Sequence, residues 1–130
     1  MNLNRRILLA GMALSFLAVS GAQAANKVPF EAAAFQAARD SGKPVVLQVA
    51  ATWCGPCQQM KRAVSELVER PEFKNVVIFE ADYDVHKEDL RKLNAYHVTT
   101  LVVYRDKNEV ERTVGEIRPE VIEALLRKAM

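Results

Sequence analysis

The chain has 130 residues, of which half are hydrophobic, and carries 18 Lys and Arg against 16 Asp and Glu. Without Arg5 and Arg6 the balance is 16 basic against 16 acidic residues, and no basic stripe is interleaved with aromatic side chains, so the composition argues against a nucleic-acid-binding protein. The length fits one compact domain and gives no support for a second.

The first 24 residues have the features of a secretory signal. Two arginines supply a positive start, residues 7–19 form an apolar run, and residues 22–24 (Ala-Gln-Ala) give a small-residue cleavage pattern. The run is about a dozen residues, shorter than the roughly 20 that span a bilayer, so an uncleaved tether is the less favoured alternative. We expect a cleaved signal over 1–24, a domain over 25–130, and a periplasmic or otherwise exported location.

The first part of the domain predicts a helix followed by a buried strand. Small and aromatic residues recur at helical spacing over 30–40, and the pattern stops before Gly42. Pro44 then opens an apolar run over 45–51, rich in β-branched residues. Such an unbroken run is typical of a strand that is covered on both faces.

The central region predicts a second helix, a second buried strand and a third helix. Residues 58–70 place apolar side chains on one face and charged ones on the other, and Pro71 ends this helix. The apolar run over 76–81 predicts the strand. Asp84 is the expected cap of a helix that reaches Asn94.

The C-terminal part predicts a β-hairpin and a last helix. Strands are expected over 101–104 and 110–114, joined by 105–109, so that they pair antiparallel. Pro119 is well placed in the first turn of the final helix. This order of elements predicts an α/β fold with a central mixed sheet of four to five strands, flanked by helices on both faces.

The two cysteines of the chain, Cys54 and Cys57, lie within four residues. A structural disulfide normally closes a longer loop, since bridging such near neighbours removes little entropy from the unfolded chain. Half of a zinc site is another possibility, but the chain has no second cysteine pair. A strand before the pair and a helix after it favour a redox dithiol.

The setting of the pair predicts different roles for the two sulfurs. A strand that delivers Cys54 to the start of a helix places its sulfur near unpaired N–H groups and the positive end of the helix dipole, which favours the thiolate. Cys54 is therefore the expected nucleophile, and Cys57 the resolving thiol. Gly55 permits close approach and Pro56 fixes the turn. Trp53 is expected to shield the sulfur and to offer partners a flat apolar surface.

The segment 53–57 (Trp-Cys-Gly-Pro-Cys) resembles the active site of the thioredoxin family, and the similarity extends from about Phe30 to the C-terminus. Residues 98–104 resemble the family's strand after the third helix, and residues 114–115 resemble the end of its last strand. The resemblance implies a thioredoxin fold, exchange with disulfides of other proteins, and no cofactor besides a redox-active disulfide.

Thr99 stands where the family carries a cis-proline beside the dithiol. An ordinary trans bond is expected before Thr99, because a cis bond to a residue other than proline is costly. Threonine offers an N–H and a hydroxyl that proline lacks, so this loop can bind substrate differently or hydrogen-bond Cys54. Relaxed selection on the loop is the plainer alternative.

Gln48 stands where thioredoxins carry a buried Asp that assists proton transfer at the resolving thiol. An amide cannot act as that base, so water or another carboxylate must do so, or Cys57 reacts more slowly near neutral pH. Glu80 aligns where the family usually has a Lys beside that Asp. It is a candidate for the displaced carboxylate, and a merely solvating Glu80 is an equal alternative.

Two more positions bear on the site. Arg62 replaces a proline that kinks the active-site helix in many thioredoxins, which predicts an unkinked helix; the C-terminal domains of DsbD-type membrane reductases share this feature and resemble residues 43–46. His97 is expected to project near the dithiol if the loop keeps the family geometry, where it and the two cysteines can offer ligands to a soft metal. A loop histidine without a ligand role is favoured, and no metal site is predicted.

The expected function is that of an exported thiol-disulfide oxidoreductase that reduces disulfides of envelope proteins, because Gly-Pro between the cysteines resembles the reducing members of the family. The expected electron donor is a membrane thiol transporter of the DsbD or CcdA type, since a cytosolic reductase cannot reach an exported protein. A thiol oxidase of the same fold, and a non-catalytic module for metal binding or chaperoning, are the alternatives. A monomer is expected, as the sequence shows no dimerisation segment.

Overall fold

The computed structural model of the protein describes residues 26–130, so the signal predicted over 1–24 lies outside the described residues. In chain order the elements are β1 (Lys27–Pro29), α1 (Ala32–Asp40), β2 (Val45–Ala50), α2 (Gly55–Val68), the short 3-10 helix η1 (Pro71–Phe73), β3 (Val77–Asp82), α3 (Lys87–Lys92), β4 (Thr100–Arg105), β5 (Asn108–Val114) and α4 (Pro119–Arg127). Within this part of the chain, no helix has the length and apolar character needed to cross a membrane.

The strands form one mixed sheet in the order β1-β3-β2-β4-β5. β1 and β2 both pair with β3 in parallel, whereas β4 pairs antiparallel with β2 and with β5. β2 therefore lies at the centre, and its side chains from Val45 to Val49 are all buried, as the unbroken apolar run predicts. The predicted α/β architecture with a mixed sheet is confirmed, and the sheet has five strands.

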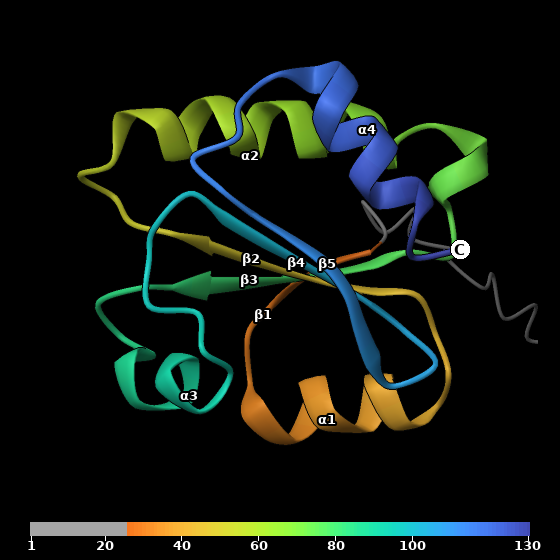
Figure 1. Ribbon diagram of the computed structural model, residues 1–130, viewed down its shortest axis with the longest axis horizontal. Helices are drawn as coiled ribbons and strands as arrows, with labels where there is room; N and C mark the ends of the chain where they lie inside the picture. Colours follow the sequence, from red (N-terminus) through yellow and green to blue (C-terminus); the bar gives the residue numbers. More distant parts are fainter. Residues whose placement is uncertain (1–25) are drawn as a thin grey trace, which may run out of the picture.

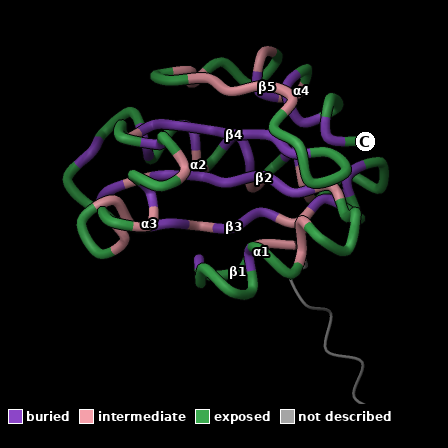
Figure 2. Tube along the Cα trace, turned by 60° about the horizontal axis from the view of Figure 1, so that its bottom comes forward, coloured by how far each residue is buried: buried purple, intermediate pink, exposed green. Residues whose placement is uncertain are grey.

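Helices cover both faces of the sheet (Figure 1). On one face, Met60 of α2 and Ile122 of α4 share a buried cluster with Val46 of β2. On the other face, Phe35 of α1 and Leu90 of α3 belong to a second buried cluster. Figure 2 shows the buried chain concentrated in the central strands β2, β3 and β4. Because β2 is enclosed between these two apolar layers, the strand that leads into the dithiol is held on both sides.

β1 is an element that the sequence did not predict. Its three residues, Lys-Val-Pro, are too few to show the apolar alternation that indicates a strand, and none of them is buried. Parallel pairing with β3 at the edge of the sheet defines it instead. The first helix consequently begins at Ala32 rather than at residue 30, and the carboxylate of Glu31 caps it by accepting the N–H groups of Ala33 and Ala34.

The hairpin between β4 and β5 is tighter than predicted. The expected connection over 105–109 is reduced to Asp106 and Lys107, both of which have positive φ (49° and 73°). This is the backbone conformation of a two-residue hairpin turn. Asn108 and Glu109 belong to the edge strand β5. Their side chains are polar and exposed, so the start of this strand shows no apolar alternation in the sequence.

The third helix is also shorter than expected, because α3 covers Lys87–Lys92 and Asp84 does not cap it. The Oδ1 atom of Asp82 accepts the N–H groups of Asp84 and Val85 at 2.8 and 3.2 Å, and these bonds hold the segment after β3 in a turn. The carboxylate of Asp84 is therefore available to the neighbouring active-site loop.

Candidate active site

The dithiol lies at the turn that leads from β2 into α2. Cys54 is the N-cap of α2 and has an extended backbone (φ −95°, ψ 106°). Its N–H donates to the carbonyl of Ala51 at 3.2 Å, and its Sγ accepts the N–H of Cys57 at 3.2 Å. Pro56 occupies the first turn of the helix, where backbone N–H groups have no partner within the helix, so its lack of an N–H costs no hydrogen bond. The helix begins at Gly55, three residues before the point that apolar periodicity indicated, and this places Cys54 Sγ at its positive end.

Cys54 and Cys57 are joined by a disulfide, and their Cα atoms are 5.3 Å apart. Cys54 is 5 % exposed, whereas Cys57 is completely buried. A partner that approaches from solvent therefore reaches the sulfur of Cys54 first. The helix dipole and the Cys57 N–H also favour negative charge on Cys54 once the pair is reduced.

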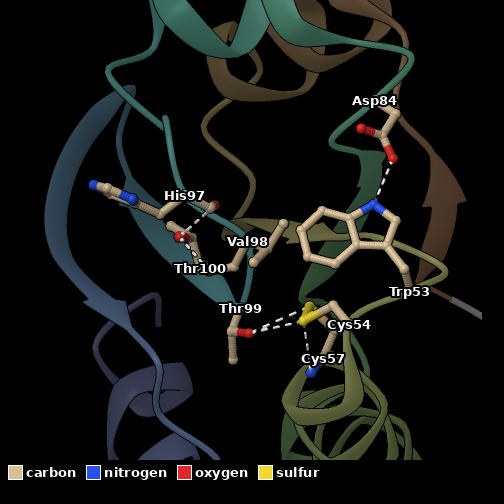
Figure 3. The surroundings of a disulfide bond; sticks show 8 residues. All are labelled: Trp53, Cys54, Cys57, Asp84, His97, Val98, Thr99 and Thr100. Atoms are coloured by element: carbon tan, nitrogen blue, oxygen red, sulfur yellow. Dashed lines mark hydrogen bonds between the residues drawn. A yellow bond between two sulfur atoms is a disulfide. The ribbon is translucent and has the colours of Figure 1, made fainter.

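Thr99 faces both sulfurs from the loop before β4 (Figure 3). Its Oγ1 lies 3.3 Å from Cys54 Sγ and 3.2 Å from Cys57 Sγ, and the residue is only 4 % exposed. The peptide bond before Thr99 is trans, as expected, since residues 26–130 contain no cis bond. The contact with Cys54 was anticipated from the hydroxyl, but the contact with Cys57 was not.

Trp53 lies beside the dithiol and is 64 % exposed. Figure 3 shows its Nε1 directed at Asp84, and the distance from Nε1 to Asp84 Oδ2 is 2.8 Å. Asp84 was expected only as a helix cap, and its bond to the indole was not predicted. The position of Asp84 just after β3 could have indicated this bond, because the carboxyl ends of the parallel strands β2 and β3 meet at one edge of the sheet and Trp53 follows β2. The bond orients the indole and leaves most of its apolar surface accessible.

Gln48 and Glu80 meet beneath this edge, on neighbouring strands. Gln48 is 1 % exposed, and its Nε2 donates to Glu80 Oε1 at 3.3 Å. The Oε1 atom of Gln48 is buried and has no hydrogen-bond partner among the described residues. Glu80 keeps 33 % of its side chain exposed and lies 3.9 Å from Lys27 Nζ. Both residues line a pocket of about 200 Å³, together with Lys61 and Asp82. A carboxylate thus stands one strand away from the buried amide.

Comparison with known proteins agrees with this geometry. The profile of the family described as Thioredoxin matches residues 26–128. The chain belongs to the thioredoxin family. An H-type thioredoxin of Fagopyrum esculentum is 36 % identical over 88 residues, which cover 68 % of this chain and 74 % of that protein. The thioredoxin Asp f 29 of Aspergillus fumigatus is 30 % identical over 89 residues, covering 68 % and 80 %. The crystal structure of Trxlp from Edwardsiella tarda EIB202 has a TM-score of 0.75 and 32 % identity, covering 77 % of this chain and 97 % of that one.

Membership of the family gives the dithiol its chemistry. This thioredoxin is a thiol-disulfide oxidoreductase, and its Cys54–Cys57 pair is able to form the disulfide that the reaction requires. Thioredoxins act on disulfides of other proteins. The less buried of the two sulfurs lies at the helix N-terminus with an exposed indole beside it, and this arrangement suits such a partner.

Further expectations about this thioredoxin concern residues around the dithiol. The expectation that His97 projects toward the sulfurs is wrong, because its exposed imidazole points away from them (Figure 3). Residues 26–130 contain no group of three His, Cys, Asp or Glu side chains that could hold a metal ion. A Cβ atom at Gly55 would meet nothing within 4 Å, so the folded chain itself does not require glycine there. α2 continues past Arg62 as one helix from Gly55 to Val68, in line with the missing proline.

Proposed function

We propose that this thioredoxin is exported and reduces disulfides of envelope proteins, with Cys54 as the nucleophile and Cys57 as the resolving thiol. The observation that carries the proposal is the position of Cys54, which caps α2, accepts the N–H of Cys57 and is the more accessible of the two sulfurs. Trp53 supplies an exposed apolar surface beside it. The Gly-Pro pair between the cysteines supports the reducing direction, since it resembles the reducing members of the family.

The proposed reaction proceeds in two exchanges. The Cys54 thiolate attacks one sulfur of the partner's disulfide, so that a mixed disulfide forms and the other partner sulfur leaves as a thiolate. The Cys57 thiolate then attacks Cys54 Sγ, the bond to the partner breaks, and the second partner sulfur leaves. The partner disulfide is reduced by two electrons, and the thioredoxin dithiol is oxidised to the Cys54–Cys57 disulfide.

Export and the electron source are parts of the same proposal. The signal pattern in residues 1–24 supports export to the periplasm or an equivalent compartment. An exported reductant must be reduced across the membrane, and we propose a membrane thiol transporter of the DsbD or CcdA type as the donor. The sequence likeness of residues 43–46 and the arginine at position 62 to the C-terminal domains of DsbD-type reductases supports this choice.

The reduction potential of the Cys54–Cys57 couple tests the direction of electron flow. Equilibration of the purified domain with glutathione is expected to give a value below about −200 mV, on the reducing side of the known range. A value near −120 mV, typical of a strong oxidant, would contradict the reductant assignment in favour of the oxidase. Stoichiometric metal binding without reduction of insulin disulfides would favour a non-catalytic module instead.

Trapping in cells tests the location and the partners. A full-length Cys57→Ala variant produced in a Gram-negative host is expected to accumulate mixed disulfides on Cys54, because the resolving step is absent. The adducts should be released by reductant, should contain envelope proteins, and should carry a thioredoxin that begins at residue 25. A matched Cys54→Ala, Cys57→Ala variant controls for association without a bond. Adducts found only with cytosolic proteins on an uncleaved chain would contradict export.

A further inference from the structure

We propose that the hydroxyl of Thr99 is a hydrogen-bond donor shared between the two sulfurs, which stabilises the Cys54 thiolate in the reduced protein and the Cys57 thiolate in the mixed disulfide. Thr99 would then be a catalytic residue, since it contacts both reacting atoms. The inference deepens the proposed function and rests on it for the order in which the two thiols react.

The contact distances and the chemistry of the pair identify the donor. Thr99 Oγ1 lies 3.3 Å from Cys54 Sγ and 3.2 Å from Cys57 Sγ. Neither sulfur of a disulfide carries a hydrogen, so the hydroxyl is the only possible donor in these contacts, and its single hydrogen can point to either sulfur. All three residues are at least 95 % buried, and a hydrogen bond to an ionised acceptor is stronger than one to a neutral acceptor. One hydroxyl can therefore serve whichever sulfur carries the charge.

The backbone holds Thr99 in place at a conformational cost. Its φ is +53°, in the left-handed region that β-branched residues avoid. The carbonyl of Thr99 accepts the N–H of Gly115 at 2.8 Å, and the hydroxyl of the next residue, Thr100, donates to the carbonyl of His97 at 2.8 Å. Strain of this kind persists where the surroundings over-determine it, and it concentrates at functional sites. Here the hydrogen-bonded loop holds the strained backbone of Thr99, and this places the hydroxyl against the two sulfurs.

The surroundings of the dithiol explain why such a donor matters in this chain. Position 48 is an amide, so no buried carboxylate is available there to take the proton of Cys57. Among the described residues, no titratable side chain is hydrogen-bonded to either sulfur. The elements packed around the pair carry these titratable groups: Lys61, Arg62 and Glu66 on α2, Glu80 and Asp82 on β3, Tyr83 and Asp84 after β3, and His97 before Thr99. A donor that lowers the pKa of Cys57 would favour its thiolate without a neighbouring base.

The resolving step can be written with Thr99 in place. While Cys54 is bonded to the partner, Cys57 releases its proton to water and the Thr99 O–H turns to the new thiolate. That thiolate forms a bond to Cys54 Sγ, the bond from Cys54 to the partner breaks, and the partner leaves as a thiolate that takes a proton from water. Thr99 keeps its own proton throughout.

Thr99→Val and Thr99→Ser form a matched pair of tests. Valine preserves the shape and the β-branch but removes the hydroxyl, whereas serine keeps the hydroxyl. The ultraviolet absorbance of the thiolate is titrated with pH in Cys57→Ala, which leaves only the Cys54 thiol, and in Cys54→Ala, which leaves only Cys57. In both backgrounds Thr99→Val is expected to reduce the ratio of thiolate to thiol about tenfold at a given pH, an upward shift of the thiol pKa, and Thr99→Ser to restore most of it.

Three results would overturn the inference: titrations of the valine and wild-type proteins that coincide, a serine variant that behaves like valine, or a shift confined to one cysteine. Thermal unfolding of each variant shows whether the fold is intact, and the valine-to-serine comparison is made only between folded proteins of similar stability. The absolute reduction potential of the wild type decides the proposed function separately. A reducing potential without a valine effect would reject the role of Thr99 alone.

Discussion

Cys54→Ser is expected to lower the rate of insulin disulfide reduction by roughly a thousandfold or more, the scale of loss that follows removal of a nucleophile. Serine keeps the size of the side chain, and its hydroxyl can still accept the Cys57 N–H that now bonds to Cys54 Sγ. The fold and the start of α2 should therefore survive. What is lost is the thiolate at the N-terminus of α2.

Cys57→Ser provides the matched comparison. Turnover should also fall, but the first exchange should proceed, so one equivalent of a small disulfide probe is expected to remain bonded to Cys54. In the reduced wild type, alkylation should occur at Cys54 before Cys57, because Cys57 is completely buried. Mass spectrometry of the alkylated peptides measures this order. Faster labelling of Cys57, or a bound probe in Cys54→Ser, would reverse the two roles.

Gln48→Asp is expected to make the stability of the protein strongly dependent on pH. Position 48 is 1 % exposed and adjoins the Glu80 carboxylate, so burial and the neighbouring charge should both raise the pKa of the new carboxyl in the folded state. The folded protein then holds a proton that the unfolded chain, with a pKa of about 3.9, releases. Stability is unaffected below that pH and falls as pH rises toward the folded pKa. A shift of about 2–3 units costs about 3–4 kcal/mol by pH 8.

Two control variants separate charge from shape in this prediction. Gln48→Asn has the same length as aspartate and no charge, so its loss of stability should not change between pH 4 and pH 8. Adding Glu80→Gln to Gln48→Asp removes the neighbouring carboxylate and should reduce the pH-dependent loss. Urea unfolding at several pH values measures all three proteins. Equal losses for the aspartate and asparagine variants at every pH would show that water reaches position 48 and solvates the charge.

Much of the fold was predictable because its determinants are local in sequence. The unbroken apolar run of β2, the amphipathic pattern of α2 and the proline at the start of α4 each report a buried or capped position within a few neighbouring residues. The elements that were missed or misplaced are those whose pattern is weak. β1 depends on pairing with β3, and the end of the hairpin depends on two residues with positive φ.

The active site shows the same division between local and distant determinants. The sequence by itself determined the dithiol and its position at a strand-to-helix turn, because both features lie within one short segment, and the likeness along most of the domain determined the family. Only the tertiary structure decided which groups surround it: Thr99 between both sulfurs, Asp84 on the indole of Trp53, Glu80 against Gln48, and His97 turned away. These contacts join residues between 31 and 45 positions apart, and their geometry is set by the register of the sheet and by the loops that leave it.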